Sequence, residues 1–437
     1  MDEQNTQSVN GVTTPQGVTA DQNPKLKLLQ EAILSGNIPQ MVLNIISYAL
    51  DLRSSDIHIE PETYTVRLRY RIDGVLRQIV EYPLNIHPAV VSRVKIMSNL
   101  KIDEQRIPQD GRCAVTTKDN REMDLRVSTL PTVNGEKIVM RIQDKSRKIP
   151  DLPELGLDPH NFQLLTEALD LPNGIILTTG PTGSGKTTTM YSCLNRLNNI
   201  DVNILTIEDP VEIQIDGLNQ SQVHADIDYT FASGLRTALR QDPDIIMVGE
   251  IRDHETIQTA IEASLTGHLV LSTIHTNSAI ETLTRIDNLG VAPFLMASTI
   301  ELIIAQRLVR KLCQACKVPH QPDENQQQRL KMAIDNLGVP GMVTAEQIAK
   351  PSFFKESEHG CPECDGIGYK GRVGLYEIMR MNNQIRRMIL DKASALDIEK
   401  AAMKSGMVTL EQDGVIKAMQ GITSLEEIYR VAKRMEL

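Results

Sequence analysis

The sequence predicts an α/β protein with two parts: a smaller α/β domain, and after it a parallel sheet with helices on both faces. Four short apolar runs, separated by helical segments, predict the sheet: 174–179, 203–207, 244–249 and 268–273. In 65–72, apolar residues alternate with arginine, which predicts a strand, and Asp73-Gly74 then provides a hairpin turn. These features predict the strands of the first domain. Apolar residues make up 41% and charged residues 23% of the chain, as in ordinary globular proteins.

The composition changes along the chain and predicts its organisation. Residues 1–24 are polar, with few apolar side chains, and are expected to be disordered. The first domain is expected over 25–147, with two short helices in 25–52 and further strands at 122–129 and 137–142. A segment rich in charge and proline at 144–153 is the expected linker. The second domain follows at 148–437, with an excursion at 311–375 and a helical part at 376–437.

Charge and composition exclude several classes of protein. The chain of 437 residues carries 46 Lys and Arg against 56 Asp and Glu, a net charge of −10, whereas proteins that coat nucleic acid usually have a basic surplus. Aromatic residues, at 3%, are too few for base-stacking platforms. No uncharged apolar run approaches the roughly 18 residues of a membrane span, and the acidic start is unlike a signal peptide. We therefore expect a soluble cytosolic protein.

The strongest motif fits the pattern G-x-x-x-x-G-K-[ST], between a strand-like run and a helical pattern. Its glycines let backbone N–H groups converge on phosphate oxygens at a helix N-terminus. Lys186 is expected to reach the β- and γ-phosphates, and the Thr187 hydroxyl to bind Mg²⁺. The predicted nucleotide-binding residues are Gly180, Pro181, Thr182, Gly183, Ser184, Gly185, Lys186, Thr187 and Thr188.

Hydrolysis also requires a carboxylate that orients water. Glu250 follows the buried run 244–249, and catalytic residues of parallel sheets gather where strands end, so Glu250 is the first candidate for the base. Glu208 follows a second strand-like run. A solvated loop with helix-capping carboxylates is the alternative for both. His268 and His275 flank 269–273, and an imidazole there could contact the γ-phosphate or be merely structural.

Arginines could stabilise the charge of the transferred phosphoryl group. Spacing alone does not choose among the candidates, and a solvated sheet face is the alternative for the arginine-rich strand. The candidates are Arg67, Arg69, Arg71, Arg126, Arg141, Arg236, Arg240 and Arg252.

Four of the six cysteines form two C-x-x-C pairs, Cys313 with Cys316 and Cys361 with Cys364. Two such pairs can present four thiolates tetrahedrally to Zn²⁺, and redox dithiols are the alternative. Four thiolates leave no open coordination position, so the predicted zinc is structural. Cys113 and Cys193 are isolated and are expected to be small core residues.

The chain resembles the secretion ATPases that drive type II secretion and type IV pilus assembly, from about residue 54 to its C-terminus. The resemblance rests on the P-loop and on further motifs along the chain: Ser55 to Pro61, Arg69 to Arg77, Arg106 to Arg112, Thr206 to Glu212, Leu239 to Asp244, Gly249 to Asp253, Thr266 to His268, His275 to Asn277 and Ala305 to Val309.

The resemblance implies a RecA-like P-loop NTPase domain preceded by a PAS-like domain, assembled as a homohexamer. It places Glu208 in the family's Asp box, Glu250 in Walker B and His275 in the His box. It also singles out Arg126 and Arg141 as the arginines that meet the γ-phosphate. The four cysteines resemble those of the assembly and secretion branch, which carries zinc.

The implied function is a cytoplasmic ATPase motor, using ATP, Mg²⁺ and structural Zn²⁺, that powers type IV pilus or pseudopilus assembly. Its expected partner is an inner-membrane platform protein, with membrane association only through partners and no nucleic acid. The larger N-terminal docking domain of many relatives is expected to be absent or reduced to residues 1–50. Two alternatives remain open: a translocase for DNA uptake or conjugation, and a nucleotide-gated assembly scaffold with negligible turnover.

Overall fold

The computed structural model describes residues 7–9, 12–14, 24–116, 122–144, 148–335, 337, 343 and 351–432. Most of the segment 1–24, predicted to be disordered, lies outside the described residues. The chain forms two compact units, one of residues 1–148 with 359–367 and one of 149–358 with 368–437. Over the described ranges, no helix has the length and apolar character needed to cross a membrane.

The N-terminal unit contains one eight-stranded antiparallel sheet with strand order β1-β2-β5-β4-β3-β8-β7-β6. The strands are β1 (Gln7–Val9), β2 (Val12–Thr14), β3 (Ser54–Pro61), β4 (Thr65–Ile72), β5 (Val75–Pro83), β6 (Gln109–Thr116), β7 (Glu122–Thr132) and β8 (Gly135–Asp144). The helices are α1 (Pro24–Leu34), α2 (Ile38–Asp51), the 3₁₀ turn η1 (Leu84–Ile86) and α3 (His87–Met97).

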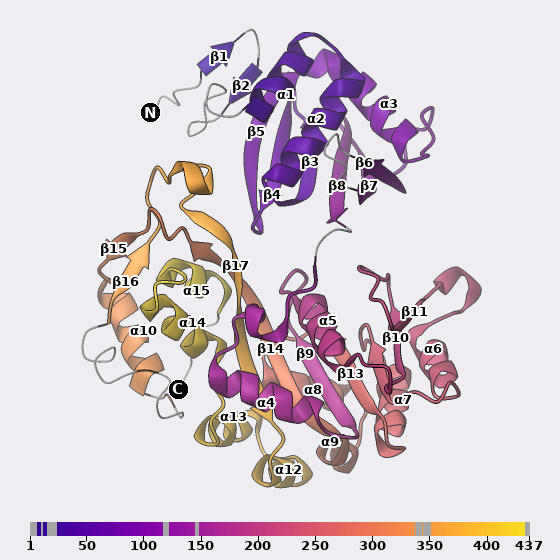
Figure 1. Ribbon diagram of the computed structural model, residues 1–437, viewed down its shortest axis with the longest axis vertical. Coiled ribbons are helices and arrows are strands. Elements are labelled where there is room, and N and C mark those ends of the chain that lie inside the picture. Colours follow the sequence, from indigo (N-terminus) through magenta and orange to yellow (C-terminus); the bar gives the residue numbers. More distant parts are fainter. Residues whose placement is uncertain are drawn as a thin grey trace. The chain divides into compact units, whose positions relative to one another are not determined.

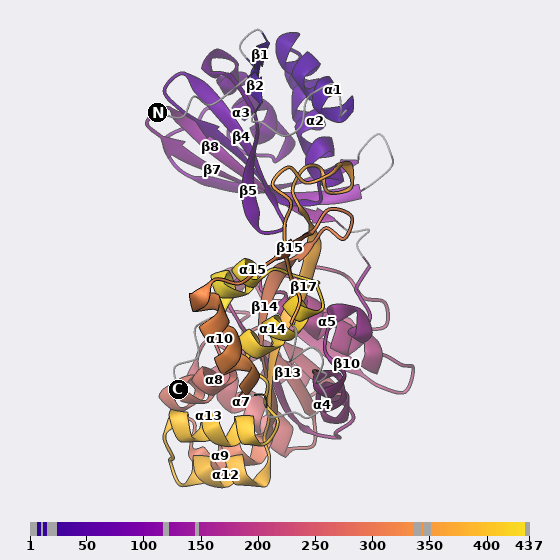
Figure 2. The same ribbon diagram turned by 90° about the vertical axis from the view of Figure 1, so that its left-hand side faces the viewer.

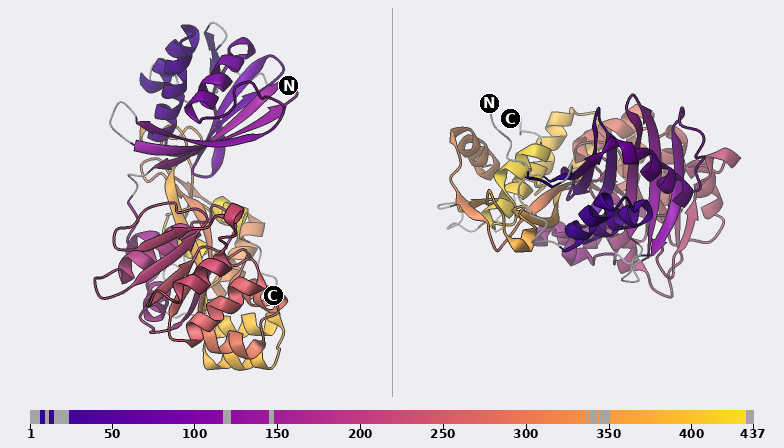
Figure 3. Two further views of the ribbon diagram at one scale, coloured as in Figure 1. Left: turned by 90° about the vertical axis from the view of Figure 1, so that its right-hand side faces the viewer. Right: turned by 90° about the horizontal axis from the view of Figure 1, so that it is seen from above.

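Alternation along the strands explains why the helices pack on one face of this sheet (Figure 3). In β4 every second residue is buried, and Val66, Leu68 and Tyr70 join the core with α1, α2 and α3. The Tyr70 hydroxyl donates to the Ile45 carbonyl of α2 at 2.7 Å. The hairpin predicted at Asp73-Gly74 is confirmed, since β4 pairs with β5 across this turn.

The second unit is built on a seven-stranded sheet with strand order β11-β10-β12-β13-β9-β14-β17, parallel except for β17. Its strands are β9 (Gly174–Thr179), β10 (Ile204–Glu208), β11 (Asn219–Gln222), β12 (Ile245–Val248), β13 (Leu269–Ile274), β14 (Ile300–Leu312) and β17 (Tyr369–Arg380). The four predicted strands are confirmed as β9, β10, β12 and β13. A further strand, β14, was not predicted; it lies between β9 and the edge strand β17.

Helices cover both faces of this sheet, as predicted (Figures 1 and 2). One apolar core contains α4 and α5, and the core of the opposite face contains α6, α7, α8, α9, α12 and α13. These helices are η2 (Leu152–Leu155), α4 (Pro159–Leu169), α5 (Lys186–Leu197), η3 (Ala225–Ile227), α6 (Phe231–Ala238), α7 (His254–Leu265), α8 (Ala279–Asn288), α9 (Pro293–Thr299), α12 (Asn383–Leu390) and α13 (Ala395–Lys404).

A third group of elements packs on the ends of β14 and β17 in a separate core. It contains α10 (Glu324–Asp335), β16 (Phe353–Lys355) with its partner strand β15 (Val318–His320), α14 (Leu410–Met419) and α15 (Leu425–Val431). The short 3₁₀ turn η4 (Pro362–Cys364) lies in the segment 359–367, which belongs to the N-terminal unit. The excursion predicted at 311–375 includes α10. The helical C-terminal part is also confirmed, from α12 to α15.

Candidate nucleotide site and metal centre

The predicted P-loop connects β9 to α5, which begins at Lys186. Gly180 and Gly185 have φ values of 150° and 90°, a region that favours glycine. A Cβ at Gly180 would lie 2.5 Å from the Gln306 carbonyl oxygen, and one at Gly185 would lie 2.8 Å from Gln306 Nε2. The Ser184 hydroxyl is buried in this loop and has no hydrogen-bond partner among the described residues. These features suit a loop that wraps closely around a phosphate.

Lys186 folds back over the loop. Its Nζ donates to the carbonyl oxygens of Gly180 at 2.9 Å and Pro181 at 3.2 Å. Burial lowers the pKa of Lys186, and the Glu250 carboxylate opposes that shift. An ammonium held by carbonyl oxygens can exchange them for phosphate oxygens, which are stronger acceptors.

Glu250 and His275 follow neighbouring parallel strands and meet at the edge of the sheet where the strands end. His275 Nε2 lies 3.2 Å from Glu250 Oε2, and Arg252 donates to the other carboxylate oxygen at 2.5 Å. The loop after β13 is fixed to the end of β9, because the Thr276 amide donates to Thr179 Oγ1 at 2.9 Å. Thr179 immediately precedes the P-loop, so this edge brings together the P-loop, Glu250 and His275.

His268 lies at the opposite end of β13, and its Nδ1 is 2.9 Å from the Ala263 carbonyl oxygen of α7. The structural interpretation of His268 therefore holds, and only His275 lies at the nucleotide edge.

Glu208 ends β10 and is 3% exposed. Both of its carboxylate oxygens accept hydrogen bonds: Oε2 from the Tyr191 hydroxyl, and Oε1 from Thr206 Oγ1 at 2.5 Å and Gln220 Nε2 at 3.1 Å. Tyr191 belongs to α5, the helix that begins at the P-loop. The solvated-loop alternative for Glu208 is therefore wrong, since the carboxylate is buried and bound to the nucleotide helix.

Three residues that shape this site were given no role from the sequence: Tyr191, Gln306 and Arg307. Tyr191 falls inside an ordinary amphipathic helix, where no local pattern distinguishes it. Gln306 and Arg307 lie in the family motif Ala305 to Val309, and they interrupt the apolar run of the buried strand β14. Both signals single them out, but neither assigns them a role.

Arg126 and Arg141 are direct cross-strand neighbours in β7 and β8 of the N-terminal unit. Arg141 Nε donates to Asp56 Oδ1 at 3.0 Å, and the Arg141 side chain is 61% exposed. Their role at the γ-phosphate stays a prediction. Among the other candidates, Arg69 forms a partly buried ion pair with Glu60, and Arg236 forms an exposed ion pair with Glu255.

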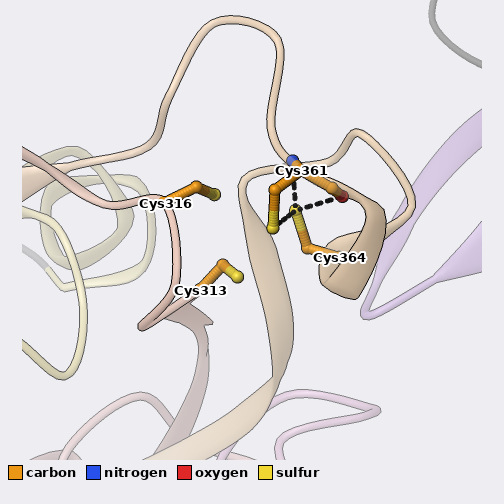
Figure 4. Close-up of side chains that lie close together, drawn as sticks. All are labelled: Cys313, Cys316, Cys361 and Cys364. Carbon is orange, nitrogen blue, oxygen red and sulfur yellow. Dashed lines mark hydrogen bonds between the residues drawn. The ribbon is translucent and has the colours of Figure 1, made fainter.

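The four cysteines of the two C-x-x-C pairs lie together at the end of β14 and just before β17 (Figure 4). All four sulfur atoms are within 4.8 Å of one another, and Cys361 Sγ and Cys364 Sγ are 3.7 Å apart. Tetrahedral zinc with Zn–S bonds of about 2.3 Å places its sulfurs about 3.8 Å apart. The Cys313 amide donates to the Gly368 carbonyl at 2.9 Å, which joins the two strand ends beside the cluster. The residues present fit a structural zinc ion.

A parallel sheet with a P-loop after one strand and an acid–histidine pair after its neighbours defines the class of P-loop nucleotide-binding proteins. The model of the family described as "Type II/IV secretion system protein" matches residues 31–430. The chain therefore belongs to the type II/IV secretion system protein family.

Individual relatives support this family assignment. The chain is 44% identical to the type IV pilus assembly ATPase PilB of Myxococcus xanthus, over 94% of this chain and 70% of that protein. It is also 44% identical to the type II secretion system protein E of Pseudomonas aeruginosa, over 95% of this chain and 79% of that protein. Among solved structures, the pilus retraction motor PilT with bound ADP matches with a TM-score of 0.57 and 27% identity, over 90% of this chain and 96% of that one.

Proposed function

We propose that the chain is an ATPase motor that hydrolyses ATP to power the assembly of a type IV pilus or of a type II secretion pseudopilus. The single observation that carries this proposal is the meeting of Lys186, Glu250 and His275 at one sheet edge in a member of this family. The 44% identity to an assembly ATPase and to a secretion protein, against 27% to a retraction motor, supports assembly over retraction. The four cysteines, which resemble those of the assembly branch, support it further.

The residues at the sheet edge have distinct roles in this mechanism. The P-loop backbone and Lys186 bind the β- and γ-phosphates, and Thr187 would hold Mg²⁺, which neutralises phosphate charge when bound. Glu250 accepts a proton from the attacking water as that water forms its bond to the γ-phosphorus. The bond between the γ-phosphorus and the bridging oxygen breaks, and ADP and phosphate leave. His275, 3.2 Å from Glu250, orients the carboxylate and can contact the phosphate.

Glu208 is the second acid of the site in this proposal. Its buried carboxylate follows β10, the neighbour of β12, and Tyr191 ties it to the nucleotide helix. It is suited to orient a water molecule beside the metal, rather than to accept the proton itself.

The assembly proposed for the motor is a homohexamer of a PAS-like domain, 25–147, and a RecA-like domain, 148–437. Arg126 and Arg141 of the first domain would stabilise the γ-phosphate charge within the closed ring. The zinc would be structural, and the motor would work at the cytoplasmic side of the inner membrane through a platform protein.

A measurement of specific activity against protein concentration tests this proposal. Phosphate release from Mg-ATP should rise steeply as the ring assembles, with the oligomeric state followed by sedimentation. Arg126→Ala and Arg141→Ala should each lower turnover without preventing ADP binding. Equal specific activity in a proven monomer would contradict the ring mechanism, and the absence of any ATP hydrolysis by the assembled chain would contradict the proposed function.

A further inference from the structure

Two consecutive residues of β14, Gln306 and Arg307, contact both loops of the nucleotide site. They are 2% and 8% exposed, in a strand that is otherwise largely apolar. Burial of an amide and a guanidinium is costly unless their hydrogen bonds are made, so the partners of these two side chains indicate what they do. β14 pairs in parallel with β9, with Ala305 opposite Thr179, the last residue before the P-loop.

Gln306 contacts the P-loop and the first turn of α5. Its Oε1 accepts a hydrogen bond of 2.8 Å from the hydroxyl of Thr189, which is fully buried. Its carbonyl oxygen lies against Gly180 and its side-chain amide against Gly185, at distances that leave no room for a Cβ at either glycine. Gln306 therefore touches the P-loop at both ends.

Arg307 reaches the loop that carries His275. Its Nη2 donates to the carbonyl oxygen of Asn277 at 2.9 Å and to Asn277 Oδ1 at 3.2 Å. Its Nη1 donates to the Gln306 carbonyl oxygen at 2.9 Å, beside Gly180. A single guanidinium thus links the residue two positions after His275 to the strand that supports the P-loop.

The buried Arg307 guanidinium interacts electrostatically with two carboxyl groups. Burial lowers the pKa of Arg307, and the carboxylates of Glu377 and Glu281 oppose that shift. An arginine remains protonated in a protein, so its five N–H donors keep a fixed geometry. A lysine ammonium lacks the planar set of N–H donors, so it could not donate to Asn277 and to the Gln306 carbonyl with the same geometry.

We propose that Gln306 and Arg307 are positioning residues for ATP hydrolysis, an inference that rests on the proposed function. Gln306 holds the P-loop in the shape that binds phosphate. Arg307 holds the loop of residues 275–277 against it, so that the Glu250–His275 pair faces the phosphate that the P-loop binds. The two residues should therefore affect different constants: Gln306 the affinity for nucleotide, and Arg307 the rate of hydrolysis.

Two variants test these two roles separately. Arg307→Gln should lower kcat about 10- to 100-fold, the usual effect of misplacing reacting groups by about 1 Å, while the Kd for ADP stays within about threefold. Gln306→Leu should raise the Kd for ADP roughly 3- to 10-fold, the range of a lost buried hydrogen bond. Amide hydrogen exchange of residues 275–278 should become faster in Arg307→Gln, a readout that does not depend on turnover.

Arg310→Gln is the matched control, because Arg310 lies on the same strand but pairs with Glu427, away from the nucleotide loops. It should lower the melting temperature and keep kcat within about twofold of the unsubstituted chain. If Arg307→Gln does not fold, Asn277→Ala tests the role of Arg307 instead. It removes only the 3.2 Å hydrogen bond from Arg307 to Asn277 Oδ1 and should lower kcat about 2- to 5-fold.

Three results would overturn the proposal: an unchanged kcat in folded Arg307→Gln, or in Asn277→Ala; an equal kcat loss in Arg310→Gln; or an unchanged ADP affinity in Gln306→Leu. A chain that never hydrolyses ATP would contradict the proposed function instead. In that case the ADP affinity of Gln306→Leu and the hydrogen exchange of Arg307→Gln still decide whether the two residues position these loops.

Discussion

Tyr191→Phe removes one hydroxyl and tests whether α5 holds Glu208 in place. The hydroxyl donates to Glu208 Oε2 and accepts from the Glu212 amide at 3.1 Å. A hydrogen bond to a charged group contributes about 1.5–3 kcal/mol and a neutral one about 0.5–1.5 kcal/mol. Losing both should therefore lower the free energy of unfolding by about 2–4 kcal/mol, most of it from the carboxylate left buried with one donor fewer.

Urea unfolding followed by circular dichroism measures this loss, and Tyr229→Phe is the matched control. The Tyr229 hydroxyl bonds Ser221 Oγ at 2.6 Å, a neutral contact on neighbouring β11. Its removal should cost only about 0.5–1.5 kcal/mol. A double-mutant cycle with Glu208→Gln isolates the pair, and a coupling energy above about 1 kcal/mol is expected between residues in direct contact.

The proposed contact between Tyr191 and Glu208 would be refuted if Tyr191→Phe lowered the free energy of unfolding no more than Tyr229→Phe does, or if the cycle gave no coupling between Tyr191 and Glu208. Because the same contact fixes Glu208 at the end of β10, ATP turnover of Tyr191→Phe should also fall. A destabilised variant with unchanged turnover would separate the structural role of Glu208 from its proposed role in the site.

Two further predictions concern the carboxylate of Glu377 and the cysteine cluster. Burial raises the pKa of Glu377 to about 7, so the stability that its bound proton contributes is complete below about pH 4.5 and is lost as pH rises through 7. The free energy of unfolding should therefore fall by on the order of 3 kcal/mol as the pH rises, and Glu377→Gln should remove most of this pH dependence between pH 5 and 8. The same pH dependence of the free energy of unfolding in both chains would contradict this prediction. Elemental analysis should find about one zinc per chain, lost in Cys361→Ser together with several degrees of melting temperature but kept in Cys113→Ser. A fully folded, metal-free chain would refute the zinc site.

The sequence predicted those parts of the fold that local patterns determine. Apolar residues alternating with arginine identified β4, and short apolar runs identified the parallel strands, because both patterns follow from which faces of a strand are buried. β14 was not predicted, since its run from Ile300 to Leu312 contains Gln306, Arg307 and Arg310 and resembles neither an alternating nor an apolar strand. Its polar residues are stabilised by partners far away in the sequence.

The residues of the candidate site also fall into a group that the local sequence predicts and a group that it does not. The P-loop and Glu250 were predictable because their chemistry requires those residue types at the end of a strand. The roles of Tyr191, Arg307 and Asn277 were not predictable, although Arg307 and Asn277 lie in motifs of the family, because these roles depend on contacts between segments that a single sequence does not connect. The position of Arg126 and Arg141 at the γ-phosphate is implied by the family resemblance and stays a prediction.

The most direct test of the account is ATP turnover in Glu250→Gln, with Glu255→Gln as the matched control on the exposed first turn of α7. Glu250→Gln should bind ATP as the unsubstituted chain does and lose roughly 10²- to 10⁴-fold in hydrolysis, while Glu255→Gln should keep its activity. Unchanged turnover in folded Glu250→Gln would contradict the central claim that this carboxylate activates water at the edge of the sheet.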